Sequence, residues 1–148
     1  EVTMKKILIV DDEEKIRKIY RDLLIDEGYY VIEASNANIA NETLLREDID
    51  LILLDIKMPK IDGGIMYDVI RMFHRKCKVI VTSVYPLDEQ RRAIPEAESY
   101  HDKSQGSEAL LAKVRSLLED SAANKNSRQR NMEQAIKISG LEKGEREA

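Results

Sequence analysis

Two apolar runs in the sequence end directly in acidic residues. Residues 7–10 lead into the acidic residues 11–13, and residues 51–54 lead into Asp55. An acidic side chain at the end of a buried strand costs free energy unless it is paired or used. Acids that converge on one place cannot all stay ionised cheaply without a cation. The pattern therefore points to a hard metal ion such as Mg²⁺, which binds carboxylates, waters and phosphate oxygens.

Two further polar side chains occupy equivalent places in the sequence. Thr82 ends the apolar run 79–82, and Lys103 follows the short segment 99–101. In an open parallel sheet the carboxyl ends of the strands share one rim, and ligands bind there. We therefore expect both side chains to lie beside the acidic cluster.

The chemistry that fits this set of residues is phosphoryl transfer. A carboxylate such as that of Asp55 can attack phosphorus and form an aspartyl phosphate. The transfer needs a metal and a cation to neutralise charge, and little further covalent work from the protein. Asp11 and Asp12 can hold the metal. Thr82 can donate a hydrogen bond from its hydroxyl, and Lys103 can pair with the phosphoryl oxygens.

Length and composition indicate one globular domain of ordinary size. The chain has 148 residues, of which 43% are hydrophobic and 35% charged, and its net charge is −4. Its apolar stretches of four or five residues are too short to span a bilayer, so no membrane contact is expected. The single cysteine, Cys77, excludes an internal disulfide and is typical of the cytoplasm. No basic stripe suggests direct nucleic-acid binding.

Apolar periodicity predicts strands and helices in alternation. The expected strands cover residues 6–10, 30–34, 51–54, 79–82 and 99–101. The expected helices lie within residues 16–24, 37–44, 65–73, 87–94 and 107–118. This order predicts an α/β fold built from parallel βαβ units with right-handed crossovers. Because the strands are apolar throughout, helices should cover both faces of the sheet.

Local signals fix the expected helix ends. Gly28 should end the first helix, and Pro95 should stop a short fourth helix. Asn36 and Ser107 should cap the second and fifth helices. In the third helix, the predicted inner face consists of Ile65, Val69, Ile70 and Phe73.

Over about residues 4–120 the sequence resembles the receiver domains of two-component response regulators. The resemblance is carried by four motifs, Ile7-Leu8-Ile9-Val10-Asp11-Asp12-Glu13, Leu53-Leu54-Asp55-Ile56-Lys57-Met58-Pro59 with Asp62-Gly63, Val81-Thr82-Ser83, and Tyr100 to Lys103. It implies a doubly wound, five-stranded parallel sheet of flavodoxin-like order 2-1-3-4-5. Any one motif alone would be a weak signal, but all four occur in the family's order.

The resemblance also implies a role for each site residue. Asp55 corresponds to the phosphoacceptor. Asp11 and Asp12 correspond to the acidic pair that binds Mg²⁺ with Asp55, and the backbone carbonyl of Lys57 would complete that metal site. Lys103 corresponds to the lysine that accompanies the phosphoryl group.

Two positions concern the conformational switch of the family. Thr82 and Tyr100 match its hydroxyl and aromatic pair, and Tyr100 is expected to turn inward when Thr82 moves toward the phosphoryl group. The family usually has proline after the lysine, but Ser104 stands here. Pro95 also falls where the fourth helix of the family would continue.

The expected function is a phosphorylation-activated switch in a two-component phosphorelay. A sensor histidine kinase or phosphotransfer protein would supply the phosphoryl group, and a downstream protein would read the altered surface. Such a receiver is not an enzyme beyond its own phosphorylation and dephosphorylation. The alternatives are a metal-dependent phosphatase with an aspartyl-phosphate intermediate, and a receiver-like module that has lost phosphorylation. Against the phosphatase, no second acid follows Asp55 two residues on.

Simpler interpretations exist for the same residues. Residues 11–13 could cap a helix whose dipole favours acids, and Asp55 could be a turn residue. Thr82 could be a plain strand residue, Tyr100 could only pack, and Lys103 could be a solvated loop lysine. His74 and His101 are expected to be exposed and without function.

The last part of the chain breaks the alternation. Residues 121–148 are rich in Asn, Ser, Arg, Lys and Glu and contain no recognisable output domain. The segment lacks a sustained apolar face, so it is expected to be mobile in the monomer. Met132, Ala135 and Ile136 have helical spacing, so a dimer contact could order it as an extension of the last helix.

Overall fold

The computed structural model describes residues 4–58, 61–119, 133 and 136–137. The chain divides into two units, Glu1–Leu118 and Glu119–Ala148. The first unit holds every candidate site residue. The expectations for residues 121–148 fall almost entirely outside the described residues.

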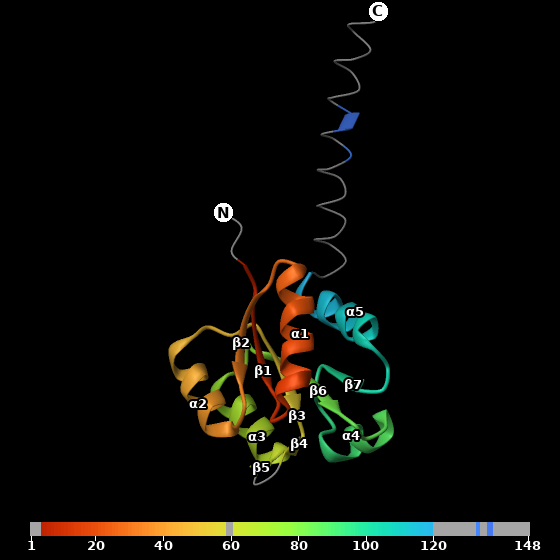
Figure 1. Cartoon of the computed structure of the whole chain (residues 1–148). Helices are drawn as coiled ribbons and strands as arrows, with labels where there is room; N and C mark the ends of the chain where they lie inside the picture. Colours follow the sequence, from red (N-terminus) through yellow and green to blue (C-terminus); the bar gives the residue numbers. More distant parts are fainter. Residues whose placement is uncertain (1–3, 59–60, 120–132, 134–135, 138–148) are drawn as a thin grey trace, which may run out of the picture. The chain divides into compact units, whose positions relative to one another are not determined.

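The first unit is an α/β fold (Figure 1). Its five-stranded sheet consists of β1 (Lys6–Val10), β2 (Tyr30–Ala34), β3 (Leu51–Asp55), β6 (Lys78–Ser83) and β7 (Ser99–Asp102). The helices are α1 (Glu14–Asp26), α2 (Ala37–Arg46), α3 (Gly63–Phe73), α4 (Leu87–Ala93) and α5 (Ser107–Leu118). The strand order is β2-β1-β3-β6-β7 and all neighbours are parallel. The predicted order 2-1-3-4-5 is thereby confirmed.

The sheet separates two cores because successive strand residues point to opposite faces. Leu8 and Ile52 pack in the core formed with α2 and α3. Ile7 and Leu51 pack in the core formed with α1 and α5. Burying both faces explains why the strands are apolar at every position.

The local signals for helix ends mostly correspond to the structure. Asn36 caps α2, since its Oδ1 accepts a hydrogen bond from the Ile39 N–H at 2.9 Å. Gly28 follows α1 with a φ of +92°, a conformation that favours glycine. The fourth helix ends at Ala93, before Pro95, as predicted. Ser107 was expected to cap the fifth helix but is instead the first residue of α5.

The predicted inner face of the third helix was correct for Ile70, which is fully buried, but wrong for Ile65 and Phe73. The side chains of α3 that enter the core are Met66, Tyr67 and Ile70, whereas Ile65 and Phe73 are 64% and 71% exposed. A tyrosine is suited to this place because its apolar ring packs inward while its hydroxyl finds a partner. Here the Tyr67 hydroxyl accepts a hydrogen bond from Nε of Arg71 at 2.8 Å.

One small element was not predicted. β4 (Lys57–Met58) and β5 (Ile61–Asp62) form a two-stranded antiparallel pair directly after β3. The sequence indicated only a turn here. The pair fixes the backbone that follows Asp55, and this backbone borders the candidate site.

Candidate functional site

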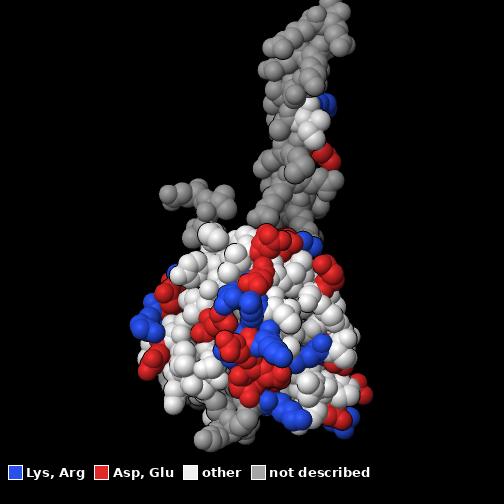
Figure 2. Space-filling model, in the orientation of Figure 1, with Lys and Arg blue, Asp and Glu red and all other residues white. Residues whose placement is uncertain are grey.

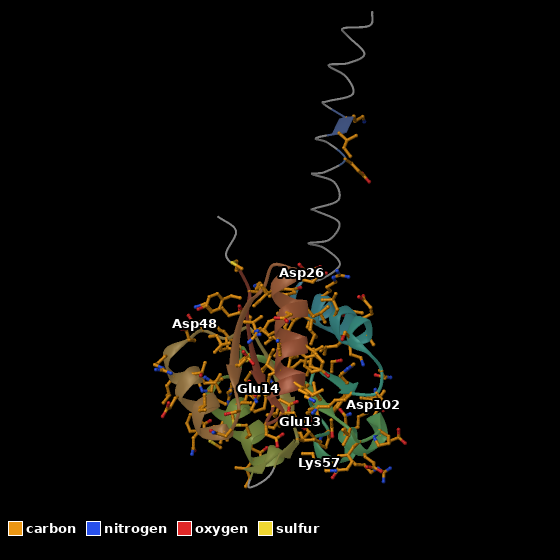
Figure 3. All side chains as sticks on the ribbon, in the orientation of Figure 1. Glu13, Glu14, Asp26, Asp48, Lys57 and Asp102 are labelled. Atoms are coloured by element: carbon orange, nitrogen blue, oxygen red, sulfur yellow. The ribbon has the colours of Figure 1, made fainter. Side chains whose placement is uncertain are left out.

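The predicted site residues meet at the carboxyl ends of the sheet strands. Asp11 directly follows β1, Asp55 ends β3, and Thr82 lies opposite Asp55 in the register of β6. Lys103 follows β7. Figure 3 shows the neighbouring residues Glu13, Lys57 and Asp102 at this same end of the sheet. The structure thus brings together residues that are up to 92 positions apart in the sequence, from Asp11 to Lys103.

Lys103 is the centre of the charge cluster. Its Nζ lies 2.8 Å from Oδ2 of Asp11, 3.1 Å from Oδ2 of Asp55 and 3.7 Å from Oε1 of Glu13. The Lys103 side chain is only 7% exposed, so its pairs with the buried Asp11 and Asp55 are shielded from solvent, whereas the Glu13 side chain is exposed. A lysine in this place is therefore not a solvated loop residue.

Burial and charge act in opposite directions on this cluster. Burial raises the pKa of Asp55 to about 6, although the Lys57 N–H and the Lys103 ammonium favour its ionised form. Burial alone would lower the pKa of Lys103, but the contacts with Asp11 and Asp55 outweigh it and raise that pKa. The site therefore contains a carboxyl group that ionises close to neutral pH beside a cation that stays charged.

Backbone hydrogen bonds orient the two buried acids. The Glu13 N–H donates to Oδ1 of Asp11, and the Lys57 N–H donates to Oδ1 of Asp55, each at 2.9 Å. Each acid thus uses one oxygen to cap the turn after its strand. The other oxygen is left to face Lys103. Asp11 and Asp55 therefore each serve both as a turn-capping residue and as a member of the charge cluster.

The acidic residues fit a hard divalent cation. Asp11, Asp12 and Asp55 each offer a carboxylate oxygen, and these oxygens lie within 4.8 Å of one another. Asp11 and Asp55 are buried whereas Asp12 is exposed, so solvent reaches the cluster from one side. Mg²⁺ is usually bound by a few carboxylates and keeps several water ligands, which this arrangement allows. Figure 2 shows Asp and Glu side chains gathered on this part of the surface, with Lys and Arg around them.

The two expected switch residues lie on β6 and β7. Thr82 is 1% exposed and lies opposite Asp55 in the register of β3 and β6. Tyr100 is 8% exposed and packs in the core with Ile94. Its hydroxyl donates to the Ile94 carbonyl and accepts from the Ala97 N–H at 3.2 Å. Tyr100 therefore already has the inward position that we expected it to take only after phosphorylation.

The turn after Lys103 has no proline. The peptide bond between Lys103 and Ser104 is trans. Oδ1 of Asp102 accepts hydrogen bonds from the Ser104 N–H at 2.9 Å and from the Ser104 hydroxyl at 2.8 Å. In addition, the Lys103 N–H donates to the Ser83 carbonyl at 2.8 Å. These contacts hold the lysine backbone at the rim.

Sequence reasoning missed two buried polar residues next to the site. His101 was expected to be exposed, but it is fully buried, with its ring edge-on to Tyr20 at 6.3 Å between centroids. Gln90 of α4 is also fully buried. A signal for Gln90 was present, because it lies on the inner helical face between Leu87 and Ile94. No such signal existed for His101, because in the four-residue strand β7 it follows the buried Tyr100 and the burial does not alternate.

Comparison with known proteins identifies the family. Residues 7–115 match the model of the response regulator receiver domain. The chain therefore belongs to this family and is a phospho-accepting signalling domain. The metal-dependent phosphatase alternative has no support.

Characterised relatives include the transcriptional regulatory protein CpxR of Escherichia coli, which is 34% identical over 116 residues. That match covers 78% of this chain and 50% of CpxR. Sporulation initiation phosphotransferase F of Bacillus subtilis is 35% identical over 81 residues, which are 55% of this chain and 65% of the relative. The chain thus spans about half the length of CpxR.

Solved structures agree with the fold. Response regulator TrrA from Thermotoga maritima, crystallised in complex with Mg²⁺–BeF, has a TM-score of 0.71 and 35% identity. The match covers 78% of this chain and all of TrrA. A CheY-like receiver domain from Methanospirillum hungatei has a TM-score of 0.73 and 28% identity, covering 79% of this chain and 95% of the other.

Proposed function

We propose that Asp55 is the residue that accepts the phosphoryl group. The observation that carries this proposal is the buried contact of the Asp55 carboxylate with Lys103, at the rim where Asp11 and Asp12 also lie. An acid whose pKa is raised to about 6 by burial is ionised at neutral pH and less solvated than a surface acid. It is therefore suited to attack phosphorus.

The residues of the chain supply positioning and charge for the transfer. Oδ2 of Asp55, the oxygen that faces Lys103, forms a bond to phosphorus while the bond from phosphorus to the donor breaks. The leaving group departs with the bonding electrons and takes a proton from solvent. Lys103, 3.1 Å from Oδ2 of Asp55, would pair with the phosphoryl oxygens. The Thr82 hydroxyl, on the neighbouring strand, would donate a hydrogen bond to them.

Asp11, Asp12 and Asp55, with the backbone carbonyl of Lys57, would hold Mg²⁺. When bound, Mg²⁺ would neutralise negative charge on the carboxylates and the phosphoryl group. The Mg²⁺–BeF complex of TrrA supports this choice of metal.

The remaining partners follow from the family. We propose a sensor histidine kinase or a phosphotransfer protein as the phosphoryl donor and a downstream protein as the target. The cytoplasmic location and a homodimer stay predictions, as does the absence of enzymatic activity beyond the chain's own phosphorylation cycle. None of the described helices is long and apolar enough to cross a membrane.

Intact mass spectrometry tests the assignment of Asp55. With a small phosphodonor such as acetyl phosphate and Mg²⁺, the wild type should gain one phosphoryl group, and Asp55→Asn should gain none. Asp50→Asn is the matched control, because Asp50 lies just before the amino end of β3, where its Oδ2 accepts from the Lys6 N–H. Asp12→Asn should raise the Mg²⁺ concentration that is needed. Undiminished labelling of Asp55→Asn would contradict the proposal.

A further inference from the structure

Gln90 occupies a place where an apolar side chain is expected. Of the α4 residues, it alone is buried, and it lies on the helix face that also carries Leu87. A buried carboxamide costs free energy unless its polar atoms are hydrogen-bonded. The residue therefore calls for an explanation beyond packing.

The Gln90 side chain donates to backbone carbonyls of two separate segments. Its Nε2 lies 2.8 Å from the carbonyl of Tyr85, 3.0 Å from that of His101 and 3.5 Å from that of Ser83. Because carbonyl oxygens can only accept, the three contacts fix which end of the amide is the nitrogen. One side chain thus connects α4 to the loop after β6 and to β7 at once.

Both of these segments carry site residues. Ser83 directly follows Thr82, and its carbonyl also accepts from the Lys103 N–H at 2.8 Å. His101 lies in β7, two residues before Lys103. Any shift of Thr82 or Lys103 toward a group on Asp55 therefore moves the carbonyls that Gln90 contacts.

Tyr85 adds a second connection to the rim. Its N–H donates to Oγ of Ser83 at 3.1 Å, and its carbonyl accepts from Gln90, so its backbone is held on both sides. Its ring faces Nζ of Lys57 at 5.1 Å, a cation–π contact. Lys57 in turn holds Asp55 through its backbone N–H.

We propose that Gln90 is a positioning residue that transmits the state of the Asp55 site to helix α4. The inference rests on the proposed function, because it assumes that Asp55 is phosphorylated. When the carbonyls of Ser83, Tyr85 and His101 move, the planar amide has to follow them, and α4 moves with it. The Oε1 of Gln90 has no hydrogen-bond partner among the described residues, so a second position of the amide can gain a donor without losing one.

A variant without the donor tests the proposal. Gln90→Met keeps an unbranched side chain of similar length, and Glu89→Met changes an exposed neighbour on the same helix as the control. Phosphorylation is followed by intact mass, and amide exchange of residues 86–94 is measured with and without beryllofluoride and Mg²⁺. Wild type and Glu89→Met should be phosphorylated and change their exchange. Gln90→Met should be phosphorylated at the wild-type rate but lose the exchange response.

The outcomes separate this inference from the proposed function. Lack of phosphorylation in the wild type would overturn the proposed function. A wild type that is phosphorylated, beside a Gln90→Met variant with an unchanged α4 response, would overturn the inference alone. Loss of phosphorylation in folded Gln90→Met would also overturn it, because the residue would then belong to the site itself.

A measurement on the wild type needs no variant. The side-chain NH₂ of Gln90 in ¹⁵N-labelled protein gives two proton signals that report its hydrogen bonds to the three carbonyls. Both signals should shift on addition of beryllofluoride and Mg²⁺, whereas the NH₂ signals of Gln105, beyond the rim, should shift less. Unshifted Gln90 signals in a protein that binds beryllofluoride would overturn the proposal.

Discussion

The rim at Asp55 and the buried polar residues around β7 differ in how they accommodate buried polar groups. At the rim the buried polar groups are charged: the carboxylates of Asp11 and Asp55 lie 2.8 Å and 3.1 Å from Nζ of Lys103. Around β7, by contrast, Gln90 of α4 and His101 are neutral and fully buried, with the His101 ring beside Tyr20 of α1 on the opposite face of the sheet from α4. Oε1 of the first and Nε2 of the second have no hydrogen-bond partner in the part of the chain that the structure describes.

The first region therefore contains buried ionised side chains, and the second contains neutral buried side chains, of which Gln90 holds the backbone in position. A buried charge cluster is costly without its partners, and a change in its charge alters the free energy of the whole site. Neutral buried amides and imidazoles change little in charge but are sensitive to geometry. Phosphorylation would act first on the charged region, and the neutral region would respond through backbone positions.

The largest expected effect comes from removing the cation of the rim. Lys103→Met leaves Asp11 and Asp55 buried without their shared partner, so we expect a loss of about 3–5 kcal/mol in the free energy of unfolding at pH 7.5. The loss should be smaller at pH 5, because Asp55 can then take up a proton. Mg²⁺ should restore part of it by binding the folded state. Denaturant unfolding at both pH values measures these differences.

A surface pair provides the control for that experiment. Lys6 and Glu47 form an ion pair of 2.9 Å in which both side chains are 35% exposed. Lys6→Met should change stability little at either pH, since solvent screens such pairs. If Lys103→Met were equally destabilising at pH 5 and pH 7.5, the loss would come from packing, and the rim would not be a charge-balanced region.

A smaller effect with the opposite sign is expected when the charge of Asp55 is removed. The pKa of Asp55 is raised from 3.8 to about 6, so its contribution to stability is present below pH 3.8 and lost as the pH rises through 6. Asp55→Asn avoids this loss. The variant should therefore be more stable than the wild type by on the order of 1–3 kcal/mol at pH 7.5 without Mg²⁺.

The gain from Asp55→Asn should disappear toward pH 4, where the wild-type carboxyl is also neutral. Mg²⁺ should reduce it at pH 7.5, because the metal stabilises the wild type. Denaturant unfolding in a pH series measures both trends. A variant less stable than the wild type at pH 7.5 would mean that the Asp55–Lys103 ion pair outweighs the burial of the charge.

The sequence predicted the charged region better than the neutral one, and the reason is physical. Acids at the ends of apolar runs are conspicuous because burial of a lone charge is expensive, so the pattern of residues alone placed Asp11 and Asp55 on one rim. The strand order came from the resemblance to the family, since periodicity alone does not choose between parallel topologies.

The neutral region was not predictable in the same way. His101 and Gln90 carry no charge at neutral pH, and their residue types do not indicate burial, since glutamine is mostly exposed in proteins and histidine is intermediate. Tyr67 is a similar case, because its inward place in α3 depends on the hydroxyl contact with Arg71, which lies one turn further along the helix. The hydrogen-bond partners of such residues come together only when the helices and strands pack. Hydrophobic pattern and propensity therefore do not predict whether these residues are buried.

His101 gives the smallest predicted effect and the sharpest test of the comparison. Burial, with Lys113 nearby, lowers the pKa of His101 from 6.5 to about 4. The unfolded state then binds more protons between these values, so His101 should reduce stability as the pH falls from 6.5 to 4. Asp55 increases stability as the pH falls through part of the same range, so the two slopes partly cancel in the wild type.

The test therefore uses Asp55→Asn as the background. In this variant Asp55 no longer contributes to the dependence of stability on pH, and the contribution of His101 remains. Adding His101→Phe, which keeps a buried ring beside Tyr20, should flatten the loss of stability between pH 6.5 and 4 by about 1–2 kcal/mol. Thermal unfolding of the single and the double variant across the range measures the slopes. Equal slopes in both would mean that His101 takes up its proton in the folded state, and the surroundings of β7 would then be a second charge-bearing region rather than a neutral one.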